Sequence, residues 1–142
     1  MAITEKQVFQ TTIGILSLVP LSAGIAGVLL GPSFLGTDVQ PGTDLSSHFR
    51  YLSGLLVGVW VGYVFCIPHI ERTGIPFRTL SIIVFCGGLA RLYSLWLDGQ
   101  PNLPHYIALG VEIGLVPLLA LWQMRIARKA KRAEVVAAGV GP

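Results

Sequence analysis

The sequence has few charged side chains. Aspartate, glutamate, lysine and arginine make up 12% of its 142 residues, whereas 53% of the residues are apolar. A soluble domain of this length cannot bury so much apolar surface, so the composition excludes an ordinary soluble globular protein. The net charge is +3, but the basic residues are confined to short segments between and after the apolar runs, which excludes a nucleic-acid-binding patch.

Cysteine and the familiar catalytic motifs are also scarce. Cys66 and Cys86 lie alone within apolar runs, with no C-x-x-C pair and no histidine at ligand spacing. The sequence has no Ser-His-Asp order, phosphate-binding loop or haem-ligand pair. We therefore expect no catalytic residues, no metal and no cofactor, and the sequence favours a protein that is not an enzyme.

Long apolar runs dominate the chain instead. A helix needs about 20 residues to cross the hydrocarbon core of a bilayer. Four segments are long enough, with glycine and proline residues marking the turns between them: residues 8–30, 47–67, 75–97 and 105–124. We predict an all-α integral membrane four-helix bundle, a single transmembrane domain over residues 1–142 whose residues 125–142 form a basic tail. Pro20 and Pro117 lie inside spans and favour kinks there.

The basic residues indicate the orientation of the spans. Short cytoplasmic segments carry an excess of lysine and arginine. With four crossings, all of the 10 basic residues except Arg50 and Arg91 lie on one side. We predict that both termini are cytoplasmic, in a bacterial cytoplasmic membrane. The tail either only fixes this topology or also contacts anionic lipid head groups through its basic cluster: Arg125, Arg128, Lys129, Lys131 and Arg132.

The same orientation predicts that the two cysteines form no disulfide. Cys66 ends the second span near the cytoplasm, whereas Cys86 lies well up the returning third span. A depth offset on the order of 10 Å exceeds the separation that a disulfide permits.

Ionisable residues within a span are costly and are candidates for a functional site. Arg91 lies about six residues before the outer end of its span and Glu112 about seven after the outer start of its own, so we predict an ion pair at a shared depth. His48, Arg50 and Tyr51 begin the second span at the same membrane face. We predict that they join the pair in one polar cluster.

This cluster has two interpretations. In the functional interpretation, the cluster binds the head group of a lipid or quinone-like ligand, or it relays protons. In the structural interpretation, the cluster is a network of ion pairs that fixes which helices pair. His48 is a candidate general base because imidazole titrates near neutrality, but a single histidine at a helix end is more often an interfacial hydrogen-bonding residue.

Small residues predict two helix contacts. Three glycines continue the stripe that begins at Arg50: Gly54, Gly58 and Gly62. This stripe predicts either close helix packing or room for an acyl chain, and Gly88 shares the face of Arg91 in the same way. Gly110 and Gly114 lie on the side of the fourth span opposite Glu112. They predict an outward face on which a second chain docks.

Three stretches carry a family resemblance: DLSSHFRYLSG at 44–54, CIPHIER at 66–72 and FCGGLARL at 85–92. The chain resembles an uncharacterised family of small four-helix bacterial membrane proteins, catalogued as domain of unknown function 4345. The resemblance runs from the first span to Trp122. It implies a four-helix membrane bundle with a polar pattern at His48, Arg50, Arg91 and Glu112, and it implies no activity.

Three hypotheses of function follow. The leading one is a non-catalytic accessory or interaction subunit of a larger membrane complex. The alternative is a membrane protein, or membrane enzyme, that binds a lipid or quinone-like ligand in an outer-leaflet polar pocket. A proton-coupled transporter is weaker, because four spans make a pathway only as a dimer and Glu112 has an arginine partner. The expected partners are membrane lipids and other membrane subunits or a second copy.

Overall fold

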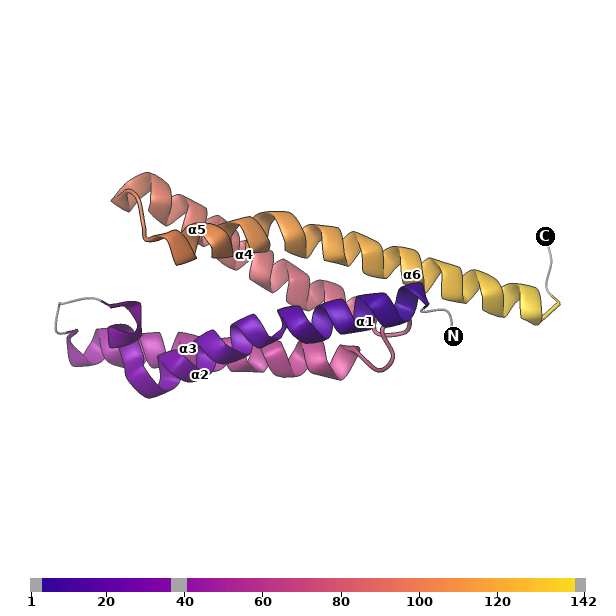
Figure 1. Cartoon of the computed structure of the whole chain (residues 1–142), viewed down its shortest axis with the longest axis horizontal. Helices are drawn as coiled ribbons and strands as arrows, with labels where there is room; N and C mark the ends of the chain where they lie inside the picture. Colours follow the sequence, from indigo (N-terminus) through magenta and orange to yellow (C-terminus); the bar gives the residue numbers. More distant parts are fainter. Residues whose placement is uncertain (1–3, 37–40, 140–142) are drawn as a thin grey trace. The chain divides into compact units, whose positions relative to one another are not determined.

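The computed structural model describes residues 4–36 and 41–139 (Figure 1). Over these residues all regular structure is helical. Four segments are long and apolar enough to cross a membrane: Glu5–Leu35, Thr43–Cys66, Gly74–Asp98 and Leu103–Ala137. The predicted all-α membrane fold with four spans is therefore confirmed.

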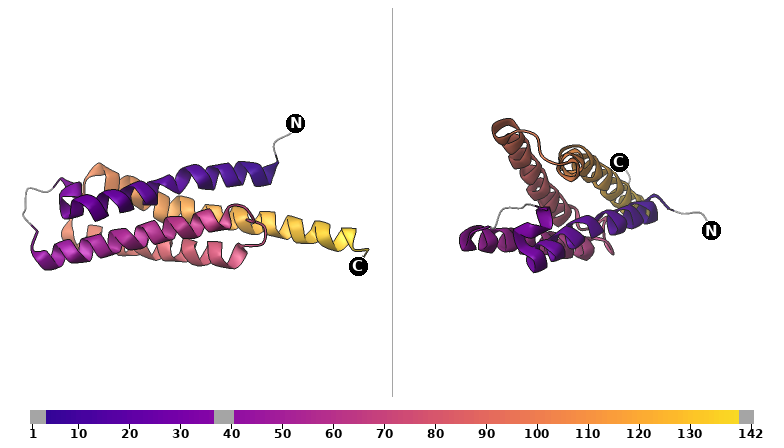
Figure 2. Two further views of the ribbon diagram at one scale, coloured as in Figure 1. Left: turned by 90° about the horizontal axis from the view of Figure 1, so that it is seen from below. Right: turned by 60° about the vertical axis from the view of Figure 1, so that its left-hand side comes forward.

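The chain divides into two compact units. The first, residues 7–68, contains most of α1 (Glu5–Leu16), then α2 (Leu18–Leu30), the 3₁₀ turn η1 (Gly31–Leu35) and α3 (Thr43–Cys66). We call it the hairpin unit, because α2 and α3 run antiparallel side by side (Figures 1 and 2).

Two glycines of α2 let it approach α3 closely. A Cβ on Gly27 would lie 2.2 Å from the Ser53 Oγ atom. A Cβ on Gly24 would lie 2.9 Å from the backbone oxygen of Ser53 and 3.1 Å from the backbone nitrogen of Val57. Helices in lipid associate through such small residues because their backbones can then touch.

The glycine stripe of α3 does not make this contact. Gly54 and Gly58 are exposed, and no atom lies within 4 Å of the position that a Cβ would take on either residue; Gly62 is half-buried. Ser53 and Val57 face α2 instead, and the two predicted roles of the stripe, packing against another helix or room for an acyl chain, stay predictions. Spacing shows which residues share a face, but not which neighbour that face meets.

The first span is interrupted at Ser17, between α1 and α2. Pro20 has no N–H to donate to the carbonyl of Leu16, so the helical ladder is broken at that level. The hydrogen bond from the Leu21 N–H to the Ser17 carbonyl is stretched to 3.4 Å. The helix is thus interrupted close to Pro20, and the predicted kink itself stays a prediction.

The second unit comprises residues 4–6 and 69–139 of the described chain, and we call it the pair unit. It contains α4 (Gly74–Asp98), α5 (Leu103–Gly110), the π-helical turn η2 (Val111–Leu115) and α6 (Val116–Ala137). In Figures 1 and 2, α4 runs antiparallel to α5 and α6. The basic tail is helical, because α6 continues to Ala137, and residues 140–142 of that tail lie outside the described residues.

Polar contacts tie the N-terminal residues and the 69–73 segment to α6. The Glu5 carboxylate accepts hydrogen bonds from the Trp122 Nε1–H, at 3.2 Å, and from Lys129. Gln123 is fully buried, and its Nε2–H donates to the Ile70 carbonyl at 2.8 Å. These contacts close the pair unit at the end opposite the 98–103 connection.

Glu71 should make the pair unit sensitive to acid. Burial raises the pKa of the Glu71 carboxyl, but hydrogen bonds from Lys6 and the backbone outweigh it and hold the pKa below its usual value. The stability that ionised Glu71 contributes to the folded protein is therefore complete above its unfolded pKa of about 4.3. This contribution is lost as the pH falls through the lower pKa of Glu71 in the folded state.

Thermal unfolding measured from neutral pH down to about pH 3 tests this expectation. Glu71→Gln should lose less stability over that interval than the wild type, because the amide does not titrate. Equal losses in the two proteins would contradict the assignment.

Candidate functional site

Arg91 and Glu112 form a two-point ion pair within the pair unit. The Arg91 Nε–H donates to Glu112 Oε2 at 3.0 Å, and its Nη2–H donates to Glu112 Oε1 at 3.2 Å. Their side chains are 31% and 19% exposed, so the pair is not sealed inside the protein. The predicted ion pair between the third and fourth spans is confirmed.

Two local features bring Glu112 against α4. Gly88 lies one helical turn before Arg91, and a Cβ there would be 2.8 Å from the Glu112 Cβ atom and 2.9 Å from Ile113 Cγ1. Glu112 itself lies in the π-helical turn that precedes Pro117, which cannot donate to the carbonyl of Ile113. Such wide turns are rare and occur frequently at functional sites.

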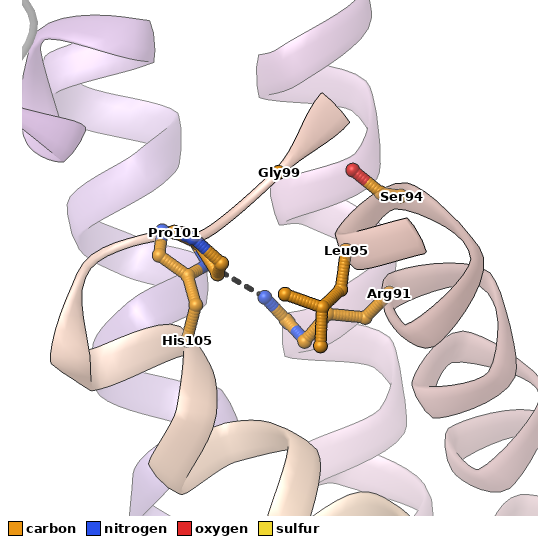
Figure 3. Close-up of a pocket in the computed structure, with 6 residues that line it drawn as sticks. All are labelled: Arg91, Ser94, Leu95, Gly99, Pro101 and His105. Atoms are coloured by element: carbon orange, nitrogen blue, oxygen red, sulfur yellow. Dashed lines mark hydrogen bonds between the residues drawn. The ribbon is translucent and has the colours of Figure 1, made fainter. Parts of the chain in front are cut away.

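His105 completes the site, although the sequence pattern does not mark it as a site residue. The Arg91 Nη1 atom lies 2.7 Å from His105 Nδ1, and Figure 3 shows the two side chains pointing toward one another. An arginine N–H can only donate, so Nδ1 accepts and the neutral imidazole carries its hydrogen on Nε2. The available signal was spacing: His105 and Glu112 are two turns apart on one helix face.

A pocket opens beside Arg91 at the 98–103 connection (Figure 3). Its volume is about 290 Å³, near the lower limit for small-molecule sites, so it fits a head group rather than a whole lipid. Its lining combines polar and apolar side chains: Arg91, Ser94, Leu95, Gly99, Pro101 and His105. The Ser94 hydroxyl donates to Asp98 Oδ2 at 2.8 Å, which commits its hydrogen outside the pocket.

Arg50 has a different set of contacts in the hairpin unit. Its guanidinium donates to the Val28 carbonyl and, at 3.1 Å, to the Leu29 carbonyl, and so caps the C-terminal end of α2. His48 and Tyr51 are exposed, with ring centroids 6.4 Å apart. Their predicted association with Arg91 and Glu112 stays a prediction.

Removing the cap should weaken the hairpin unit. Arg50→Met keeps an apolar stem but leaves the last carbonyls of α2 without their donor, and we expect a loss of about 1–2 kcal/mol in unfolding free energy. Chemical denaturation in detergent micelles measures it. Arg128→Met is the matched control, and a loss no larger than in that control would refute the capping role.

The other predicted contact residues are placed as follows. Gly110 and Gly114 are exposed, with no atom within 4 Å of a Cβ on either, so they lie away from the contact between Glu112 and α4. In the basic cluster of α6, Arg125 and Lys129 form ion pairs with Glu5. Docking of a second chain and contact with anionic lipid both stay predictions.

One family model matches residues 8–123, and its description is "Domain of unknown function (DUF4345)". The chain belongs to this family. The match contains at least part of each of the four spans and includes Arg91, His105 and Glu112, whereas Glu5 and the basic cluster of α6 lie outside it. No curated protein and no solved structure matches the chain. The description of the DUF4345 family states no function, so the function is inferred from the site itself.

Proposed function

We propose that the protein binds the polar head group of an amphipathic membrane molecule in the pocket beside Arg91. The observation that supports this is the donor count of the guanidinium. Arginine has five N–H groups; Glu112 takes two and His105 takes one, so two have no acceptor within residues 4–36 and 41–139. An N–H without an acceptor is expensive in a lipid environment, and a ligand oxygen in the pocket would supply one.

Mass spectrometry of the molecules that co-purify with the protein tests this function. We expect one amphipathic species to be enriched with the wild type and to be absent from the double variant Arg91→Leu/Glu112→Leu. In this variant both charges of the ion pair are removed, so neither is left without its partner. Arg128→Met controls for general loss of lipid. The same species at the same level in all three proteins would refute the proposal.

A role as an accessory subunit is the second candidate, and the exposed Gly110 and Gly114 support it. A surface of this kind permits close approach of another membrane helix. Extraction in a mild detergent followed by native mass spectrometry tests it. A larger complex that is lost in Gly110→Leu supports this candidate, and a lone monomer counts against it.

We also propose that both termini face the cytoplasm of a bacterial cell, with the protein in its cytoplasmic membrane. The basic residues of α6 and of the 69–78 segment support this orientation through their excess on one side. In a background without Cys66 and Cys86, a membrane-impermeant thiol reagent added outside should label Leu45→Cys but not Lys131→Cys. Labelling of Lys131→Cys in intact cells would reverse the topology.

A further inference from the structure

We propose that the head group held beside Arg91 is uncharged and presents a carbonyl oxygen. This inference rests on the proposed ligand-binding function and specifies the chemical class of the ligand. It follows from two properties of the site, its charge balance and its excess of hydrogen-bond donors.

The charges at the site cancel. The positive guanidinium of Arg91 is matched at two points by the carboxylate of Glu112, at 3.0 and 3.2 Å. His105 is neutral, because its Nδ1 accepts from Arg91. A charged head group would lose its hydration on entering the site and would meet no opposite net charge there, which is unfavourable. An anion would in addition be repelled by the Glu112 carboxylate, which already pairs with Arg91.

The free hydrogen-bonding groups of Arg91 and His105 are donors. They are the two remaining N–H groups of Arg91 and the Nε2–H of His105, for which the described residues offer no acceptor. Ser94 is the other polar residue of the lining; its hydroxyl hydrogen is directed to Asp98, and its oxygen remains an acceptor. A carbonyl oxygen has two lone pairs and no hydrogen, so it complements these donors.

Apolar surface surrounds these donors. Leu95 and Pro101 line the pocket, and Leu103 and Ile107 on the adjoining α5 are 71% and 61% exposed. The pocket of about 290 Å³ accommodates a ring or an ester group, and an alkyl tail would extend along the apolar face of α5. Two kinds of membrane molecule share this chemistry: a quinone and a neutral glycerol ester.

Four probes that carry the same decyl chain test the ligand class. They are a decyl-substituted benzoquinone, monodecanoylglycerol, decanoate and decyltrimethylammonium, and each is titrated into the protein in nanodiscs of one phosphatidylcholine. We expect one of the two carbonyl probes to bind at least about tenfold more tightly than either ion. Whichever carbonyl probe binds more tightly identifies the source of the ligand.

Two variants distinguish failure of the uncharged-ligand inference from failure of the proposed ligand-binding function. His105→Phe keeps the ion pair and removes the Nε2–H, and Arg91→Leu/Glu112→Leu removes the ion pair; each should weaken the preferred carbonyl probe by about tenfold. Tighter binding of decanoate that is lost in the double variant would overturn the uncharged-ligand inference and leave the proposed function standing. Binding of every probe that is equal in wild type and double variant would overturn both.

Discussion

Replacing either Arg91 or Glu112 alone by leucine should destabilise the protein by about 3 kcal/mol, whereas replacing both should restore most of that loss. Each single change leaves the other charge in a part-buried site without its partner. The double change removes both charges and puts apolar side chains in their place. A structural pair of this kind is worth less than the cost of breaking it.

A double-mutant cycle on the free energy of unfolding measures this coupling. It requires the wild type, the two single variants and the double variant in one detergent. Additive losses in the double variant would show that the two side chains do not interact, and the geometry of the pair unit would then be wrong.

The second large effect is expected at Gly27, in the hairpin unit. Gly27→Ala places a Cβ 2.2 Å from Ser53 Oγ and 2.8 Å from its Cβ atom, which is closer than atoms pack. Ser53 cannot turn away freely, because its hydroxyl donates to the Phe49 carbonyl at 2.8 Å. The helices must therefore separate, and we expect a loss of about 1–3 kcal/mol in unfolding free energy.

Gly54→Ala is the matched control, since a Cβ on Gly54 meets no atom within 4 Å. Alanine is the better helix former, so this change should be neutral or stabilise by up to about 1 kcal/mol. Both variants can be compared by denaturation in the same detergent. A larger loss for Gly54→Ala than for Gly27→Ala would contradict the assignment of Gly27 to the close contact between α2 and α3.

The sequence predicts the spans and the ion pair for related reasons. Apolar length alone defines a membrane span, because the thickness of the hydrocarbon core sets how many residues a helix needs. Arg91 and Glu112 could be paired from sequence since two helices joined by a short connection bring similar depths together. Depth is a one-dimensional property, and it can be counted along the chain.

It is harder to predict which residues of one helix contact a given neighbouring helix. The α3 glycines share a face with Arg50, but the partner that packs on α2 is Ser53, one residue before Gly54. His105 is missed because it lies at the start of α5, where a polar residue is ordinary. Its contact with Arg91 depends on how the 98–103 connection turns, which the residue pattern does not specify. Tertiary contacts determine which side of a helix meets its neighbour, and the pattern of a single sequence does not specify these contacts.

The structure of the protein purified from its own membrane, at its native stoichiometry, tests the ligand site most directly. We expect density for a non-protein molecule between Arg91 and His105, with an oxygen atom within hydrogen-bond distance of the guanidinium and the Arg91–Glu112 pair intact. A pocket closed by side chains of the protein, or one that holds only water, would contradict the proposal.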